Sequence, residues 1–269
     1  MDAPGIARDP DNTNDLENHK PGEAAMKKQF AVRSLVAATA LAVVALSPVA
    51  HADAGVTGSL GVVSKYVLRG ITTPASEHDG AAVQAGITYD TGTGFSLGWW
   101  GSSLSYADNM ASGFENDIIA DYSLGLGEDM TLAFGGVYYY YVDIDDADVL
   151  EPYVNFSYGP LTVGAKVLTD DVVWGNKTDT YLTVSFSQDL PMDFSFTALA
   201  GFYRYKKDGE FLPETAASKS SGFRHLDLTL SHPLGKTGLD MSVTYIVGGE
   251  DRYGGDQEDT MVLGVSGSF

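Results

Sequence analysis

The sequence of 269 residues contains no cysteine and few basic residues. Without cysteine, the chain can form no disulfide, no thiolate-ligated zinc or iron–sulfur site and no catalytic thiol. Its 16 Lys and Arg residues against 36 Asp and Glu residues give a formal net charge of -20, which disfavours contacts with nucleic-acid phosphates. We therefore expect no nucleic-acid partner.

Long hydrophobic runs are also scarce. The most apolar stretch, residues 35–46, is shorter than the roughly 20 residues that a transmembrane helix needs. It follows the basic start Met26-Lys-Lys and leads to Ala50-His-Ala52, which is typical of a secretory signal peptide with cleavage before Asp53.

The predicted cleavage divides the chain into three parts. Residues 1–25 are polar with no hydrophobic period, so we expect an over-extended, disordered start; residues 26–52 are the predicted signal peptide, and residues 53–269 a single domain. This domain holds 30 of the 36 acidic residues but only 11 of the 16 basic ones, so the negative charge belongs to the folded part.

What the sequence has in abundance is glycine, aromatic residues and alternation. It contains 31 Gly, 15 Tyr and 12 Phe, and apolar residues recur at every second position, as in strands with one apolar face. We predict twelve strands, with apolar stripes at 56–68, 83–89, 95–99, 118–124, 132–140, 154–158, 161–167, 182–186, 194–202, 226–230, 239–247 and 261–269.

The connections between these strands alternate in length. The long ones are 71–80, 107–113, 143–148, 170–178, 206–221 and 248–258, and the short ones are 91–94, 127–129, 159–160, 189–192 and 232–238. Such sorting indicates an all-β fold: a 12-stranded antiparallel transmembrane β-barrel of the outer-membrane type, with short turns in the periplasm and long loops outside. A soluble barrel with apolar residues inside is the alternative, but twelve strands would leave a hollow that side chains could not fill.

The C-terminal segment supports the membrane interpretation. Residues 261–269 alternate and end on an aromatic residue, as the last strands of outer-membrane barrels commonly do. We predict that Leu263, Val265 and Phe269 form the signal for the barrel-insertion machinery.

If the apolar stripes face lipid, the remaining strand positions face the lumen. The predicted pore-lining residues are Lys65, Arg69, Glu115, Asp117, Asp121, Tyr139, Tyr141, Glu151, Tyr153, Lys166, His225 and Asp227. Their five carboxylates against three cations predict a weak cation preference. Alternatively, Glu151 and Lys166 on adjacent strands neutralise each other within a filled lumen, since twelve strands lie between the filled eight-stranded and the open sixteen-stranded barrels.

Signals for catalysis and metal binding are weak. His225 with Asp227 resembles a base and its orienting group, but no serine motif accompanies the pair. The acidic loop 143–148 lacks the glycine and glutamate of an EF-hand. We therefore predict no enzyme activity, no metal and no cofactor.

Several motifs resemble the TorF-type porin family. They are Ser64-Lys-Tyr-Val-Leu-Arg-Gly-Ile-Thr72, Gly94-Phe-Ser-Leu-Gly-Trp-Trp-Gly-Ser102, Gly136-Val-Tyr-Tyr-Tyr-Tyr141 and Glu151 before Ser157-Tyr-Gly159. The resemblance implies an outer-membrane barrel with porin activity and no established substrate or catalytic residues. Thr183 and Asp121 depart from the family pattern, so the family's selectivity does not transfer to this chain.

Together, these observations predict a porin-like channel for passive diffusion of small hydrophilic solutes or ions. The alternative is a closed structural or adhesive barrel that acts through its extracellular loops. The expected partners are outer-membrane lipid and lipopolysaccharide, the barrel-insertion machinery, and small solutes or cations.

Overall fold

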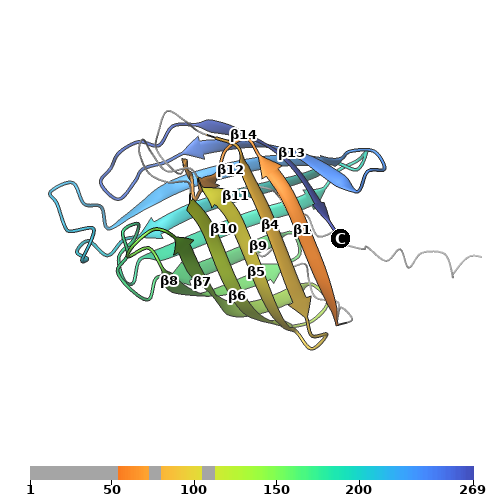
Figure 1. Ribbon diagram of the computed structural model, residues 1–269, viewed down its shortest axis with the longest axis horizontal. Helices are drawn as coiled ribbons and strands as arrows, with labels where there is room; N and C mark the ends of the chain where they lie inside the picture. The colour runs from red at the N-terminus through yellow and green to blue at the C-terminus, as the bar shows by residue number, and fades with distance from the viewer. Residues whose placement is uncertain (1–53, 73–79, 105–112) are drawn as a thin grey trace, which may run out of the picture. The chain divides into compact units, whose positions relative to one another are not determined.

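The computed structural model describes residues 54–72, 80–104 and 113–269 (Figure 1). The predicted signal peptide at 26–52 and the N-terminal stretch 1–25 lie outside the described residues, as do parts of the first two predicted long loops. No helix in the described part of the chain is long and apolar enough to cross a membrane.

Twelve strands form one closed antiparallel barrel in which each strand pairs with its neighbours in sequence and β14 pairs back with β1. This confirms the predicted fold class. The barrel strands are β1 Gly55–Val63, β4 Ala82–Asp90, β5 Phe95–Leu104, β6 Gly113–Gly125, β7 Met130–Val142, β8 Val149–Tyr158, β9 Leu161–Val167, β10 Thr180–Asp189, β11 Ser195–Arg204, β12 Ser221–Pro233, β13 Leu239–Gly248 and β14 Thr260–Ser268.

The connections lie at opposite ends of the barrel according to length, as predicted. One end carries the turns 91–94, 126–129, 159–160, 190–194 and 234–238, and the other carries the longer segments, including 168–179, 205–220 and 249–259. The tightest turn is Gly159-Pro160, where Gly159 adopts a φ of 54°, a backbone conformation that glycine reaches without strain. We call these the short-turn end and the long-loop end.

The two faces of the sheet differ in chemistry, because successive side chains of a strand point to opposite sides. On β6, Ile118 is 50% exposed, while its neighbours Asp117 and Ile119 are 1% and 9% exposed. The same alternation runs around the barrel, with Leu60, Val184 and Leu263 on the exposed outer face and Glu151 and Thr244 buried inside. The outer face is therefore apolar and the inner face largely polar.

The first predicted strand is wrong beyond residue 63. We expected Tyr66 and Leu68 on the outer face, but β1 ends at Val63 and the chain turns inward. There it forms a small hairpin of β2 Val67–Leu68 and β3 Ile71–Thr72. The two strands of this hairpin are joined by a two-residue turn with Arg69 at φ 52° and Gly70 at φ 79°, which reverses the chain inside the lumen.

This β2–β3 hairpin fills the long-loop end of the lumen. Tyr66 and Val67 are 5% and 4% exposed and belong to a buried apolar cluster on the inner wall. The cluster also includes Val63, Ala82, Leu104, Val137, Val149, Leu168 and Val172. The apolar core of this barrel therefore lies inside one end of the lumen, where the hairpin meets the wall.

Candidate functional site at the lumen constriction

Arg69 is at the tip of the β2–β3 hairpin and reaches side chains of three barrel strands. Its Nη2 lies 2.5 Å from Glu151 Oε2 on β8 and donates to the Tyr139 hydroxyl on β7 at 3.2 Å. Its Nη1 donates to the Tyr203 hydroxyl on β11 at 2.6 Å. Tyr139 in turn donates to Glu151 at 2.9 Å, so the guanidinium and the carboxylate share a partner. Arg69 therefore bridges the lumen between strands β7 and β8 on one side and β11 on the other.

Aromatic rings surround the same guanidinium. The Arg69 Cζ atom lies 4.5 Å from the centroid of the Tyr181 ring, 5.8 Å from that of Tyr203 and 5.9 Å from that of Trp174. Cations are attracted to the faces of aromatic rings, and the attraction grows when water is excluded. Because Arg69 and Glu151 are 4% and 0% exposed, we expect this ion pair and its rings to hold the hairpin firmly.

The backbone of the hairpin tip is also held. Arg224 on β12 donates from Nε to the Arg69 carbonyl at 3.1 Å. Gly70 packs so closely on the same strand that a Cβ atom there would lie 2.5 Å from His225 Cβ. His225 is itself fixed, because Nδ1 lies 2.7 Å from Asp227 Oδ1 and Nε2 lies 2.6 Å from the Tyr181 hydroxyl.

A second polar group lies on β6 and its neighbours. Glu115 accepts hydrogen bonds from the hydroxyls of Tyr66 and Tyr141, the latter at 3.1 Å. Asp117 follows on the same inner face, 1% exposed. Nearer the short-turn end, Asp121 accepts from the Tyr153 hydroxyl at 3.0 Å. The carboxylates of β6 thus form a row along the lumen.

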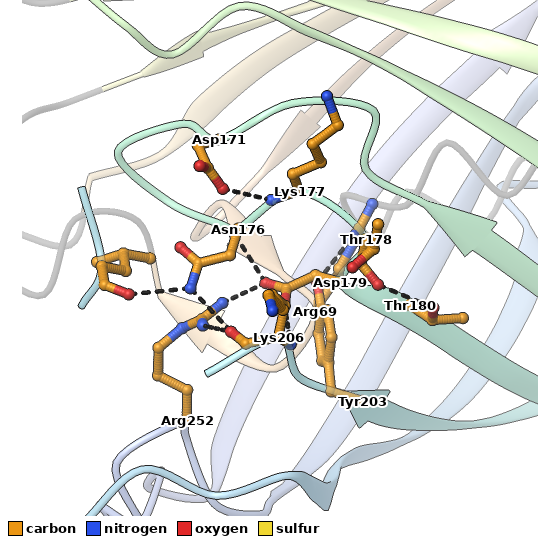
Figure 2. Close-up of polar contacts among 11 residues, drawn as sticks. Arg69, Asp171, Asn176, Lys177, Thr178, Asp179, Thr180, Tyr203, Lys206 and Arg252 are labelled. Atoms are coloured by element: carbon orange, nitrogen blue, oxygen red, sulfur yellow. Dashed lines mark hydrogen bonds and ion pairs between the residues drawn. The ribbon is translucent and has the colours of Figure 1, made fainter. Parts of the chain in front are cut away.

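Asp179 joins three long loops close to Arg69, as Figure 2 shows. Asp179 accepts from the backbone N–H of Asn176 at 2.9 Å and of Lys206 at 2.7 Å, and pairs with Arg252. The Asn176 amide donates to the carbonyls of Lys206 at 2.8 Å and Leu212 at 2.9 Å. These contacts link the β9–β10, β11–β12 and β13–β14 loops, and we call them the loop clamp.

An aromatic stack connects the loop clamp to the Arg69 site. Tyr205, just beyond β11, stacks on Tyr203 with ring centroids 5.0 Å apart, and the Arg252 guanidinium lies 5.0 Å from the Tyr205 ring. Burial raises the pKa of the Tyr205 hydroxyl to about 12. The hairpin and the loops are therefore packed through the same column of tyrosines.

The size of the inward side chains changes along the lumen. Towards the short-turn end most inward positions are small and uncharged, with Asp121 as a charged exception. The small ones include Ser59, Gly86, Ser96, Gly98, Ser157, Gly164, Ser185, Thr197, Thr229, Ser242 and Ser266. Towards the long-loop end the inward positions are occupied by tyrosines and charged residues, and the β2–β3 hairpin lies among them. The lumen narrows at the β2–β3 hairpin, which we call the lumen constriction.

Ten of the twelve predicted pore-lining residues lie on barrel strands at inward positions, and whether they line a conducting path stays a prediction. They are Glu115, Asp117, Asp121, Tyr139, Tyr141, Glu151, Tyr153, Lys166, His225 and Asp227. The other two were assigned to the first strand, and this was wrong: Arg69 reaches the lumen from the hairpin, and half-buried Lys65 lies between β1 and β2. Glu151 forms its close ion pair with Arg69, a contact that we did not predict.

Four residues of the constriction were missed. Tyr181 and Tyr203 could have been found, because each neighbours a predicted outward residue, Leu182 or Phe202. Arg224 could not, since the pairing shifts between Gly201 and Phe202, and this bulge makes Arg224 an extra residue in β12. Tyr66 was placed on the wrong face.

Catalytic or metal chemistry has little support at this site. His225 has both ring nitrogens engaged by Tyr181 and Asp227, and the side chain is fully buried. Among the described residues, no group of three or more His, Asp or Glu side chains could hold a metal ion. The polar groups of the constriction are arranged to hold the hairpin against the wall.

A closed antiparallel barrel that is apolar outside and polar inside has the fold of outer-membrane-type barrels. The chain belongs to the family described as "Bacterial protein of unknown function (Gcw_chp)", whose model matches residues 49–251. The family's description leaves its function open, and the resemblance to TorF-type porins stays a prediction.

Solved structures with a similar fold include porins. The KdgM porin is 12% identical with a TM-score of 0.51, covering 79% of this chain and 99% of that chain. The NanC porin is 12% identical with a TM-score of 0.49, covering 79% of this chain and 98% of that chain. At such low identity the likeness to KdgM shows the fold alone. No curated protein matches the sequence.

Proposed function

We propose that the protein is a porin-like channel of the bacterial outer membrane that admits small hydrophilic solutes or ions. The observation that carries this proposal is a closed barrel of twelve strands with an apolar outer face and a polar lumen. A bilayer accepts only structures that satisfy their backbone hydrogen bonds internally, and a closed barrel does so. The surrounding lipid would cover the outer face. The exposed side chains of Leu263 and Val265 on β14 and of Phe269 directly after it are our candidates for the insertion signal.

The lumen constriction would limit what passes. Small Ser, Thr and Gly residues leave room at the short-turn end, while Arg69 and its partners occupy the long-loop end. The predicted lumen charges were five carboxylates and three cations, and the buried Arg224 adds one more cation. We therefore propose only a weak preference for cations, set mainly by Asp121, which has no cation as its hydrogen-bond partner.

The same constriction supports a second candidate, a closed barrel that acts through its loops. The Arg69–Glu151 pair is almost fully buried, and the loop clamp orders three loops at the same end. In this case the hairpin would be a permanent plug and the barrel a rigid support for the loops.

Conductance in planar bilayers separates the two candidates. For a channel we expect current steps from the wild-type protein and larger steps from Arg69→Ala, because this change removes the hydrogen bonds and the ion pair that hold the hairpin across the lumen. Retained heat-modifiable migration on gels would show that the variant is still a folded barrel. If neither folded protein passes current, the channel proposal fails and the closed barrel remains.

A further inference from the structure

A groove lies on the outer face of the barrel at its long-loop end. It crosses β10, β11 and β12, is open to the outside and has a volume of about 590 Å³. Its lining is Leu182, Phe202, Tyr203, Arg204, Ser220, Ser221, Gly222 and Phe223. The rings of Phe202 and Phe223 meet edge to face with centroids 5.6 Å apart. The groove therefore combines an apolar floor with a polar upper edge.

The bulge in β12 accounts for this groove. Gly201 pairs with His225, whereas the next residue, Phe202, pairs with Phe223, so Arg224 has no opposite residue. Arg224 turns into the lumen towards Arg69, and Phe223 stays outside beside Phe202. Beside Phe223, Gly222 leaves open space, because a Cβ atom there would meet nothing within 4 Å.

The upper edge of the groove is positively charged. Arg204 is exposed at the end of β11, and its guanidinium makes no hydrogen bond or ion pair with any residue that the structure describes. Of the other basic residues in this part of the chain, Arg224 points into the lumen, and Lys207 and Lys219 pair with Glu214 and Glu250. Among the described residues, Arg204 is thus the cation at this groove that has no carboxylate partner.

We propose that this groove binds a phosphorylated lipid of the surrounding bilayer. The phosphate would meet the Arg204 guanidinium, whose planar N–H groups suit phosphate oxygens, and the Ser221 hydroxyl. An acyl chain would lie along Leu182, Phe202 and Phe223, which are 42%, 39% and 38% exposed and continue the apolar outer face. A free anion would use only the edge of the groove, and an uncharged lipid only its floor.

The proposal concerns the outer face and stands independently of conduction. The test uses the full folded chain in detergent, titrated with bis-phosphorylated lipid A and, separately, with the same lipid after removal of its phosphates. Native mass spectrometry counts the bound lipids and gives the dissociation constant. Wild type, Arg204→Gln and the control Lys236→Gln are compared; Lys236 is an exposed cation in a short-turn connection at the other end.

We expect one lipid A to bind the wild type and Lys236→Gln alike. Arg204→Gln should weaken binding about tenfold, since it removes a charge-assisted hydrogen bond. The dephosphorylated lipid should bind the wild type as weakly as lipid A binds Arg204→Gln. Equal binding of lipid A to wild type and Arg204→Gln would overturn the proposal, and so would displacement of lipid A by millimolar inorganic phosphate, which would indicate an ion site without a lipid.

Discussion

At the scale of single residues, charge inside the barrel is handled in two ways. Arg69 and Glu151 are paired and buried at the constriction, where their opposite charges offset each other. Asp121 is closer to the short-turn end, and its hydrogen-bond partners are the neutral hydroxyls of Tyr153 and Ser96. The Arg69–Glu151 pair holds the hairpin in place, whereas Asp121 keeps a negative charge that would act on an ion in the proposed channel.

Replacing Asp121 with lysine tests the role of this charge. In the proposed channel, Asp121→Lys should shift the reversal potential in a salt gradient towards anions, because the lumen loses a carboxylate and gains a cation. The control is Asp129→Lys, which makes the same charge change at an exposed residue of a short turn. An unchanged reversal potential would remove Asp121 from the predicted pore-lining residues.

Neutralising Glu151 tests the buried pair. Glu151→Gln leaves the Arg69 charge buried without its counter-ion, and the loss should be about 3–5 kcal/mol of unfolding free energy. For the exposed pair of Lys207 and Glu214, 3.7 Å apart, Glu214→Gln should cost about 0–1 kcal/mol. Urea unfolding of the refolded barrel measures both, and equal effects of the two substitutions would contradict the proposed role of Glu151.

At the scale of elements, the β2–β3 hairpin is the part of the chain that distinguishes this barrel from a simple tube. It is short, with two residues in each strand, and it is stable here because it packs inside the barrel. Its two-residue turn places Arg69 towards Glu151 and Gly70 against His225. A change at the turn should therefore act on the lumen without altering the barrel strands.

Gly70→Ala is the sharpest change at this turn. A Cβ atom at Gly70 would collide with His225, and the positive φ adds about 1–2 kcal/mol of strain, so we expect the hairpin to leave the wall and single-channel conductance to rise. Gly159→Ala is the matched control: its φ of 54° brings the same strain, but a Cβ atom there would meet nothing within 4 Å. Bilayer recordings that show the same conductance for both variants would exclude steric contact as the cause.

At the scale of the whole molecule, apolar side chains cover the outer face of the barrel and polar side chains line much of its lumen. In a water-soluble domain the large apolar side chains are buried, whereas here residues such as Leu60 and Ile118 are about half exposed, at 56% and 50%. The buried positions include many Glu, Asp, Ser and Thr side chains beside the apolar cluster at the long-loop end. This distribution is stable only if an apolar medium covers the outer face.

Adjacent residues of β10 test which face meets lipid. Val184 is 46% exposed on the outer face, and Thr183 points into the lumen. In a bilayer, Val184→Lys should lose about 2–4 kcal/mol of folding free energy, because a charge is placed near the hydrocarbon midplane. Thr183→Lys should lose much less. Folding into lipid vesicles at graded urea concentrations measures both, and a larger loss for Thr183→Lys would reverse the assignment of the faces.

Much of the fold could be predicted from local patterns in the sequence. Strand alternation and connection length are properties of short segments, so the number of strands, their antiparallel order and the apolar outer face follow without knowledge of distant contacts. The inward positions of Asp117, Asp121, Glu151 and Asp227 follow from the same parity. The loop sorting then assigns the two ends of the barrel.

Other features depend on contacts between residues that lie far apart in the sequence. The inward hairpin depends on a bond between Arg69 and Glu151, which are 82 residues apart, and on Tyr66 finding Glu115 across the lumen. The β12 bulge depends on Arg224 reaching the Arg69 carbonyl, 155 residues away in sequence. The alternation of side chains predicts which face a residue occupies only while the strand continues. Where the chain leaves the sheet, its direction depends on contacts with residues far away in the sequence. Local patterns therefore suffice to predict a barrel with a polar lumen, whereas the hairpin that constricts one end of it follows from contacts between distant segments.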